Sequence, residues 1–481
     1  MTDCDAFDAI HTQHHYTPSL EATIAASFGA GSDLYNCGQL RSKQLEDFMR
    51  QSPGNEAMLT ENLRHLFHTQ MALGFFDPPE LNPYSKLNTE EDVDTPAARA
   101  LAKEAAEQSL TLLVNREGTL PLRSGVKRLA LIGPNANATT TMQGNYATSK
   151  APLLVSPLDG FRDLGLTVEF AQGTGVGTPS EPAEVAAAVA AAKRAEAVCV
   201  VVGLDGTQEG EGHDRTSLLL PGNQTELVEA VADAASKPIV VIVMSGSGLD
   251  VSALVANPKV GAIMWSGYPG QSGGTAIAEA VMGLQNPAGR LPMTWYFANF
   301  TSQVKKTQMA LRPSAGYPGR THRFFDAPVL FPFGAGIGYT TFAVKLDAGM
   351  KTAISLQQAR AELERSRERP HEAPTIMTAQ LSVENTGSKR GAHTVREHSP
   401  CRIWHASVLT RIGFLPGAAL PLAAWRRPRR EATAAAEVGS TQPTLAATTP
   451  MADGSSGSGC VGNSSASRLW SPAARLPSHC H

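Results

Sequence analysis

Between about residues 95 and 297, the chain alternates short apolar runs with alanine-rich stretches of helical length. Continuous apolar runs are typical of strands buried on both faces, and their alternation with helices favours parallel strands joined by helical crossovers. We therefore predict an α/β fold, a three-layer α/β sandwich with a parallel sheet. The expected strands are 128–132, 166–171, 197–203, 238–244 and 260–265, with a candidate edge strand at 290–296. The expected helices are 96–114, 182–195, 222–236 and 271–284.

The first 80 residues contain pieces of a second α/β unit. The pattern predicts a strand end at Asp3, helices near 17–28, 41–51 and 55–73, and a short strand near 29–37. This is too little for a complete domain of that type. The prolines and acidic residues that follow predict a linker over 81–94, before a sandwich domain over 95–300.

The pattern changes again towards the C-terminus. Residues 301–345 extend the sandwich domain, and 346–395 combine a linker with a strand-like alternation that ends in a turn near 388. From residue 396 the periodicity disappears, and residues rich in Ala, Ser, Thr, Pro, Gly and Arg take over. Such a composition buries too little apolar surface to offset chain entropy, so we predict a disordered tail over 396–481. Its basic cluster is more typical of a solvated run than of a site for an acidic partner.

Length, charge and composition argue against several classes of function. A chain of 481 residues holds two to four domains at about 100–200 residues each. A net charge of −3 argues against a general nucleic-acid binder. The apolar runs are far shorter than the roughly 20 residues of a membrane-spanning helix. The six cysteines form no C-x-x-C pair, so no zinc or redox motif is indicated.

A series of short motifs occurs in order over about residues 1–342. They include Thr2-Asp3-Cys4-Asp5-Ala6, His14-His15-Tyr16-Thr17, Gly144-Asn145-Tyr146, Glu209-Gly210-Glu211-Gly212-His213-Asp214-Arg215 and Pro287-Ala288-Gly289-Arg290-Leu291-Pro292. The order and spacing of these motifs resemble those of glycoside hydrolase family 3, especially its β-xylosidase and α-L-arabinofuranosidase branch. The resemblance implies a (β/α)8 barrel followed by an α/β sandwich, with residues 1–80 as the C-terminal remnant of the barrel.

The resemblance also implies a chemistry. Members of this family remove terminal β-linked sugars with retention of configuration, here xylose from xylo-oligosaccharides, by means of two carboxyl groups about 5–5.5 Å apart. By motif match, Asp3 is the expected nucleophile, and Glu209 is favoured over Glu211 as the acid/base residue. His15 and Tyr16 are candidate substrate contacts. No cofactor or metal is implied, and the expected partner is an oligosaccharide or glycoside, with neither nucleic acid nor membrane.

The same residues also allow simpler interpretations. A glutamate in a glycine-rich acidic loop is usually a solvated surface residue, and an aspartate near an N-terminus is usually just polar. Histidines such as His14 and His15 more often pack or lie at the surface than bind sugar. Asp214 and Arg215 are interpreted as an ion pair that holds the loop. Under this view the alternative function is a non-catalytic carbohydrate-binding or scaffold protein built on the sandwich.

The two ends of the chain depart from the family pattern. The chain begins at the expected nucleophile, without the preceding barrel strands, so we expect an N-terminally truncated sequence with impaired catalysis. The first residues do not form a signal peptide, although the family resemblance implies an extracellular or cell-wall location for a full-length member. Residues 380–386 resemble the first strand of a fibronectin-III-like β-sandwich, and the sequence after 396 does not continue it.

Overall fold

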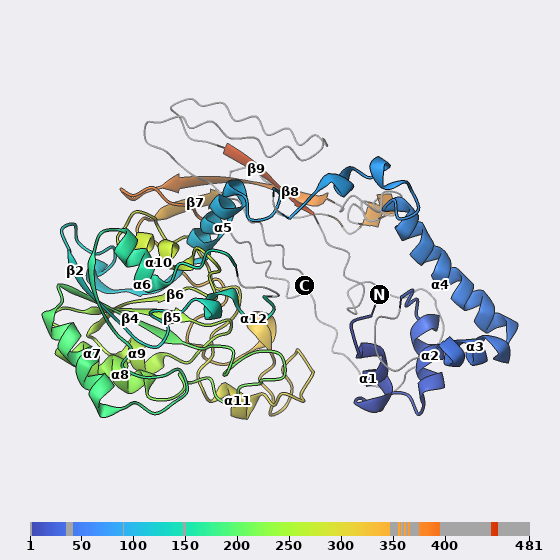
Figure 1. Ribbon diagram of the computed structural model, residues 1–481, viewed down its shortest axis with the longest axis horizontal. Helices are drawn as coiled ribbons and strands as arrows, with labels where there is room; N and C mark the ends of the chain where they lie inside the picture. Colours follow the sequence, from blue (N-terminus) through green and yellow to red (C-terminus); the bar gives the residue numbers. More distant parts are fainter. Residues whose placement is uncertain are drawn as a thin grey trace. The chain divides into compact units, whose positions relative to one another are not determined.

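The fold is given by a computed structural model, which divides the chain into two compact units, Met1–Thr95 and Pro96–His481 (Figure 1). The residues that the structure describes are 2–34, 42–89, 91–147, 151–346, 355, 357, 360–361, 364–365, 375–394 and 444–450. Within them, no helix is both long enough and apolar enough to cross a bilayer.

The second unit is built on a six-stranded sheet with the order β1-β6-β5-β4-β2-β3. Its strands are β1 (Thr111–Asn115), β2 (Arg128–Ile132), β3 (Thr167–Ala171), β4 (Ala197–Gly203), β5 (Ile239–Met244) and β6 (Val260–Trp265). Neighbouring strands from β3 to β6 run parallel, whereas β1 pairs with β6 in the antiparallel direction. The sheet is therefore mixed, and the prediction of an all-parallel sheet is wrong at this edge.

The edge strand also differs from the one predicted. Helix α5 (Pro96–Ser109) ends earlier than the predicted 96–114, and the apolar run after it forms β1, with Leu112 opposite Met264. The stretch 290–296 forms no strand; Trp295 makes only an isolated bridge with Phe331. The outer side of β1 instead makes an isolated bridge between Leu112 and Ile337.

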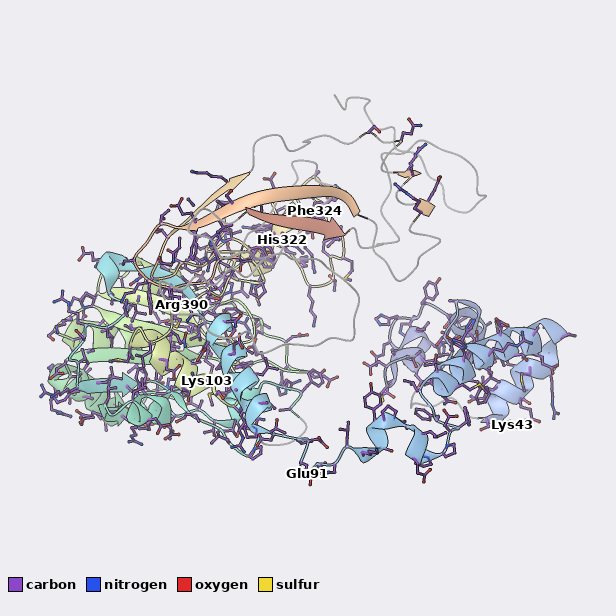
Figure 2. The ribbon with its side chains drawn as sticks, turned by 90° about the horizontal axis from the view of Figure 1, so that it is seen from above. Lys43, Glu91, Lys103, His322, Phe324 and Arg390 are labelled. Atoms are coloured by element: carbon purple, nitrogen blue, oxygen red, sulfur yellow. The ribbon has the colours of Figure 1, made fainter. Side chains whose placement is uncertain are left out.

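Helices cover both faces of the sheet. The helices α5, α6 (Pro157–Asp163) and α10 (Gly273–Val281) cover one face, and α7 (Pro182–Arg194), α8 (Gln224–Ala234) and α9 (Ser252–Ala256) cover the other (Figure 1). Lys103 of α5, labelled in Figure 2, donates to Glu279 of α10 over 2.7 Å and also pairs with Glu107. The helices and the sheet form the three layers of an α/β sandwich.

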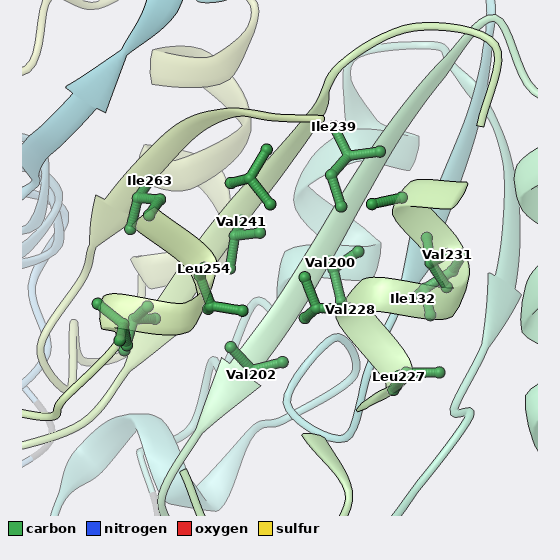
Figure 3. Packing of buried hydrophobic residues seen from close by; sticks show 14 of the residues in the cluster. Ile132, Val200, Val202, Leu227, Val228, Val231, Ile239, Val241, Leu254 and Ile263 are labelled. Carbon is green, nitrogen blue, oxygen red and sulfur yellow. The ribbon is translucent and has the colours of Figure 1, made fainter. Parts of the chain in front are cut away.

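The two-residue periodicity of the strands explains why the sheet has a separate apolar core on each face. Alternate residues of a strand point to opposite faces, so Val200 and Val241 pack with α8 and α9 while Val201 and Ile242 pack with α6 and α10. Figure 3 shows the first cluster, in which Val228 of α8 lies against the strands. Every residue of β4, β5 and β6 is buried, which accounts for their continuous apolar sequences.

The first unit contains α1 (Ala6–Thr12), α2 (Leu20–Gly29), α3 (Ser42–Gln51) and α4 (Pro53–Ala72), followed by the short 3₁₀ turns η1 (Pro79–Leu81) and η2 (Pro83–Lys86). The hydroxyls of Ser19 and Ser52 cap α2 and α4 by accepting backbone N–H bonds. The described residues of this unit include no strand, so the expected strand near 29–37 is absent from 29–34, and 35–37 lie outside the described residues. Sequence periodicity also missed α1.

Short elements complete the second unit. They are η3 (Arg116–Gly118), η4 (Thr140–Gln143), α11 (Phe300–Gln303) and α12 (Thr321–Phe324). A separate antiparallel sheet pairs β7 (Phe342–Leu346), β8 (Thr375–Asn385) and β9 (Thr444–Pro450) in that order. Strand β9 lies within the segment expected to be disordered and differs from that prediction; the rest of 396–481, with its basic cluster, lies outside the described residues.

Candidate functional site

The candidate site lies at the carboxyl ends of the parallel strands. From β2 the chain crosses to β3 on one side and then to β4 on the other, so the winding direction reverses between β2 and β4. Open α/β sheets bind ligands outside the carboxyl ends of their strands near such a reversal. The loops that follow β4, β5 and β6 meet there, and Glu209 lies in the first of them.

Donors from all three loops surround the Glu209 carboxylate. Oε1 accepts hydrogen bonds from the Gly246 backbone N–H over 2.6 Å and from the Tyr268 hydroxyl over 2.8 Å. Oε2 accepts from the Ser247 hydroxyl and lies 3.7 Å from Nε of Arg215. Only 16% of the Glu209 side chain is exposed. Each carboxylate oxygen thus has two polar partners, as a largely buried carboxylate requires.

Arg215 joins this network rather than pairing with its sequence neighbour. Its Nη2 donates to the Ser247 hydroxyl oxygen over 2.7 Å and to the Gly248 carbonyl over 3.0 Å. Burial lowers the pKa of Arg215, and the neighbouring Glu209 carboxylate opposes that shift. The expected ion pair within the loop is therefore wrong. The buried guanidinium has its partners in the network, whereas the exposed Asp214 carboxylate pairs with Lys306.

Tyr268 follows β6 closely, and its ring is half-buried. Burial raises the pKa of the Tyr268 hydroxyl, and the hydrogen bond to Glu209 raises it further, so the hydroxyl remains a donor at neutral pH. A Cβ added at Gly246 would lie 3.1 Å from Oε1 of Glu209 and 3.0 Å from Cε2 of Tyr268. Glycine therefore allows the backbone N–H to approach the carboxylate.

The loop places Glu209 and Glu211 in different surroundings. The Glu209 backbone N–H donates to the Asp205 carbonyl over 3.1 Å, which holds Glu209 at the base of the loop. Gly210 and His213 exchange backbone hydrogen bonds of 3.4 Å and 3.0 Å, and the turn that they close carries the exposed Glu211. Between the two candidates, the structure brings Glu209 to the meeting point of the loops.

Asp3, His15 and Tyr16 belong to the first unit. Asp3 is exposed, and its Oδ1 accepts the Cys4 backbone N–H over 2.8 Å; Cys4 is disulfide-bonded. His15 is exposed with φ of 50°, and its Nδ1 lies 3.1 Å from the His11 carbonyl oxygen. The Tyr16 side chain is 80% exposed.

Sequence reasoning missed Tyr268, Ser247 and Gly246. A signal was present: the Ser-Gly-Ser-Gly run at 245–248 directly follows a predicted strand, and Tyr268 lies three residues beyond the next one. Polar or small residues at the carboxyl ends of neighbouring parallel strands converge at one edge of a sheet. Among the described residues, no group of three or more His, Cys, Asp or Glu side chains is arranged to hold a metal ion.

Comparison with known proteins decides the family. Residues 110–339 match the glycosyl hydrolase family 3 C-terminal domain. Beta-D-xylosidase 1 of Arabidopsis thaliana is 42% identical over 412 residues, which is 82% of this chain and 52% of that protein. The chain belongs to glycoside hydrolase family 3. The resemblance found in the motifs is thus confirmed.

Two further relatives refine this placement in family 3. A beta-xylosidase/alpha-L-arabinofuranosidase 2 of Medicago sativa subsp. varia is 43% identical, covering 72% of this chain and 45% of that protein. A solved family 3 exo-β-xylosidase in complex with a xylobiose aziridine probe superposes with a TM-score of 0.73 and 31% identity, over 93% of this chain and 55% of that one. The chain spans about half the length of the curated relatives that it matches.

Proposed function

We propose that the protein is an exo-acting, β-xylosidase-like glycoside hydrolase that releases terminal β-linked xylose from xylo-oligosaccharides with retention of configuration. The observation that carries the proposal is the Glu209 carboxylate, held where three loops converge at the carboxyl edge of the family 3 sandwich. The names of the relatives, β-xylosidases of plants and fungi, support the choice of sugar.

The proposed mechanism uses two carboxyl groups. The Asp3 carboxylate attacks the anomeric carbon while protonated Glu209 gives its proton to the departing glycosidic oxygen, which leaves xylose bound to Asp3 as an ester. Glu209, now ionised, then takes a proton from water as the water attacks the same carbon and releases Asp3. The mechanism requires the two carboxyl groups to lie about 5–5.5 Å apart in the working enzyme.

The remaining roles are proposals on the same basis. The first unit is assigned to the (β/α)8 barrel of the family, and there His15 and the exposed Tyr16 ring would contact the sugar. The sheet of β7 and β8 is assigned to a partial fibronectin-III-like segment. An extracellular or cell-wall location is supported by the disulfide at Cys4, since disulfides persist mainly in oxidising compartments.

The full chain, assayed with para-nitrophenyl β-xyloside, tests the proposal. Glu209→Ala should lower turnover by about 10²–10⁴-fold, the usual contribution of a general acid or base, because the glycosyl ester then lacks the base that activates water; azide should restore turnover by attacking that ester. Asp3→Asn should abolish turnover without rescue of this kind. The matched control is Glu211→Ala, at the exposed turn. Loss and azide rescue in that variant, with Glu209→Ala still active, would transfer the acid/base role to Glu211.

A second candidate function is a non-catalytic carbohydrate-binding or scaffold protein built on the sandwich. The observation in its favour is that both faces of this sheet are fully covered, so that the second unit has a core of its own. Calorimetry with xylo-oligosaccharides separates the two functions. Binding without any turnover by the unmodified chain would support the second candidate and exclude the first.

A further inference from the structure

We propose that Tyr268 is a positioning residue for Glu209, which keeps the carboxyl group oriented and tunes its proton exchange; this inference rests on the proposed function. Tyr268 comes from the loop after β6 and Glu209 from the loop after β4, and their side chains meet over 2.8 Å between the hydroxyl and Oε1. The loop after β5 contributes Gly246 and Ser247, and Arg215 comes from the same loop as Glu209, so three loops hold one carboxylate.

The partners of the two carboxylate oxygens differ in whether they can only donate a hydrogen bond or can also accept one. At Oε2, the Ser247 hydroxyl oxygen accepts from Arg215 over 2.7 Å, which directs the Ser247 proton towards Glu209. At Oε1, the Gly246 N–H can only donate, whereas a tyrosine hydroxyl can donate or accept. Since an acid/base residue alternates between protonated and ionised forms, Tyr268 is the partner suited to remain hydrogen-bonded in both.

The ring of Tyr268 is itself confined. A Cβ added at Gly144 would lie 3.5 Å from its Cδ2, and one added at Gly246 would lie 3.0 Å from its Cε2. Two glycine-containing loops therefore approach the same edge of the ring, which limits its movement on that side. Such confinement is what a residue needs in order to hold another group in place.

The first test is Tyr268→Phe in the full chain, with pH profiles of kcat/KM on two substrates. Loss of a donor to the carboxylate keeps the acid protonated to higher pH, so the alkaline limb should move up by about one pH unit. Cleavage of xylobiose releases xylose, a poor leaving group that the acid must protonate, so the kcat on xylobiose should fall about tenfold more than the kcat on para-nitrophenyl β-xyloside. Tyr317→Phe, which removes a hydroxyl bonded to the Ala310 carbonyl elsewhere, is the matched control.

A merely structural role for Tyr268 gives a different result. Tyr268→Phe would then lower the melting temperature and reduce turnover of both substrates equally, with both limbs of the pH profile unmoved. That outcome overturns the inference while leaving the proposed hydrolase function intact.

The second test does not depend on activity. Nuclear magnetic resonance is recorded on the full chain with isotope-labelled tyrosine. The Tyr268 ring resonance is the one that is lost in Tyr268→Phe. It should shift in Glu209→Gln and stay unchanged in Glu211→Gln. No shift in Glu209→Gln means that the hydroxyl does not pair with Glu209, and the inference is wrong. If the resonance shifts but the unmodified chain shows no turnover, the hydrogen bond exists without a catalytic role. The inference then fails together with the proposed function.

Discussion

The two units of this chain bury their apolar residues to very different extents. In the second unit, helices cover both faces of a sheet whose three central strands are buried along their whole length. In the first unit, five residues form the buried cluster, namely Phe7, Ile24, Phe28, Phe48 and Leu59. Large apolar side chains remain exposed around α4 and the turn after it: Leu63, Phe67, Met71, Leu73, Phe75 and Phe76.

The difference shows what a secondary structure needs in order to be stable. Burial of apolar surface is the main favourable term in folding, and a helix with one covered face gains little from its other side. The ion pairs of the two units also differ in their exposure. In the first unit Lys43 and Asp47 pair within one exposed helix, whereas in the second unit Lys103 joins α5 to α10 through Glu279. The pair of Asp33 with His65 joins two segments of the first unit as well, but its acidic and basic side chains are each more exposed than the corresponding ones of Glu279 and Lys103.

The largest predicted effect concerns backbone packing in the second unit. Gly203 ends β4 with φ of 148°, and a Cβ there would lie 1.9 Å from the Met244 carbonyl oxygen. We expect Gly203→Ala to lower the free energy of unfolding by at least about 3 kcal/mol, through backbone strain and overpacking together. Urea unfolding followed by hydrogen exchange of peptides from each unit measures the loss where it occurs.

Two glycines serve as controls for that experiment. Gly31, in the first unit, has φ of 93° with open space around it, so Gly31→Ala should cost only the conformational strain of about 1–2 kcal/mol. Gly206, on the loop after β4, also has open space, and Gly206→Ala should change the stability by less than about 0.5 kcal/mol. Equal losses in Gly203→Ala and Gly31→Ala would contradict the claim that packing separates the units.

A smaller effect is predicted on the exposed face of α4. Phe67 and Met71 are 44% and 64% exposed, so the double change Phe67→Lys and Met71→Lys should alter the free energy of unfolding by no more than about 0.5 kcal/mol per residue. It should also lower the binding of a hydrophobic dye, which a third variant, His68→Lys on the same helix, leaves unchanged. A loss of about 2 kcal/mol or more would show that another surface buries this face in solution.

Sequence periodicity predicted the central part of the fold well and its edges poorly. The runs at 128–132, 197–203 and 260–265 are strands with those same bounds, because continuous burial leaves continuous apolar sequence. The helical pattern extends over the edge strand β1, since Thr111–Asn115 follows the helical residues of α5 without a glycine or proline between them. Pairing with β6, a contact far along the chain, decides that segment.

The candidate site was predictable only in part. Motif order identified the family and made Glu209 a candidate, but most of its network partners come from loops about 40 to 60 residues away, and no local pattern links them to the glutamate. Arg215 was noticed and given the wrong partner for the same reason. Spacing along the chain identifies residue types suited to a chemistry, whereas their partners depend on which strand ends the sheet brings together.

The smallest predicted effect uses pH to test the network between α5 and α10. Burial raises the pKa of Glu107 above its ordinary value of 4.5, while its hydrogen bond with Lys103 lowers it. Between that value and the raised one, the folded chain holds more protons than the unfolded chain, so its stability falls as pH rises through this window. The slope of the urea midpoint against pH should flatten in Glu107→Gln, which cannot titrate, and persist in Asp47→Asn on exposed α3. Equal slopes in the two variants would mean that burial between helices does not set this titration, and the contrast between the units would then be limited to their apolar cores.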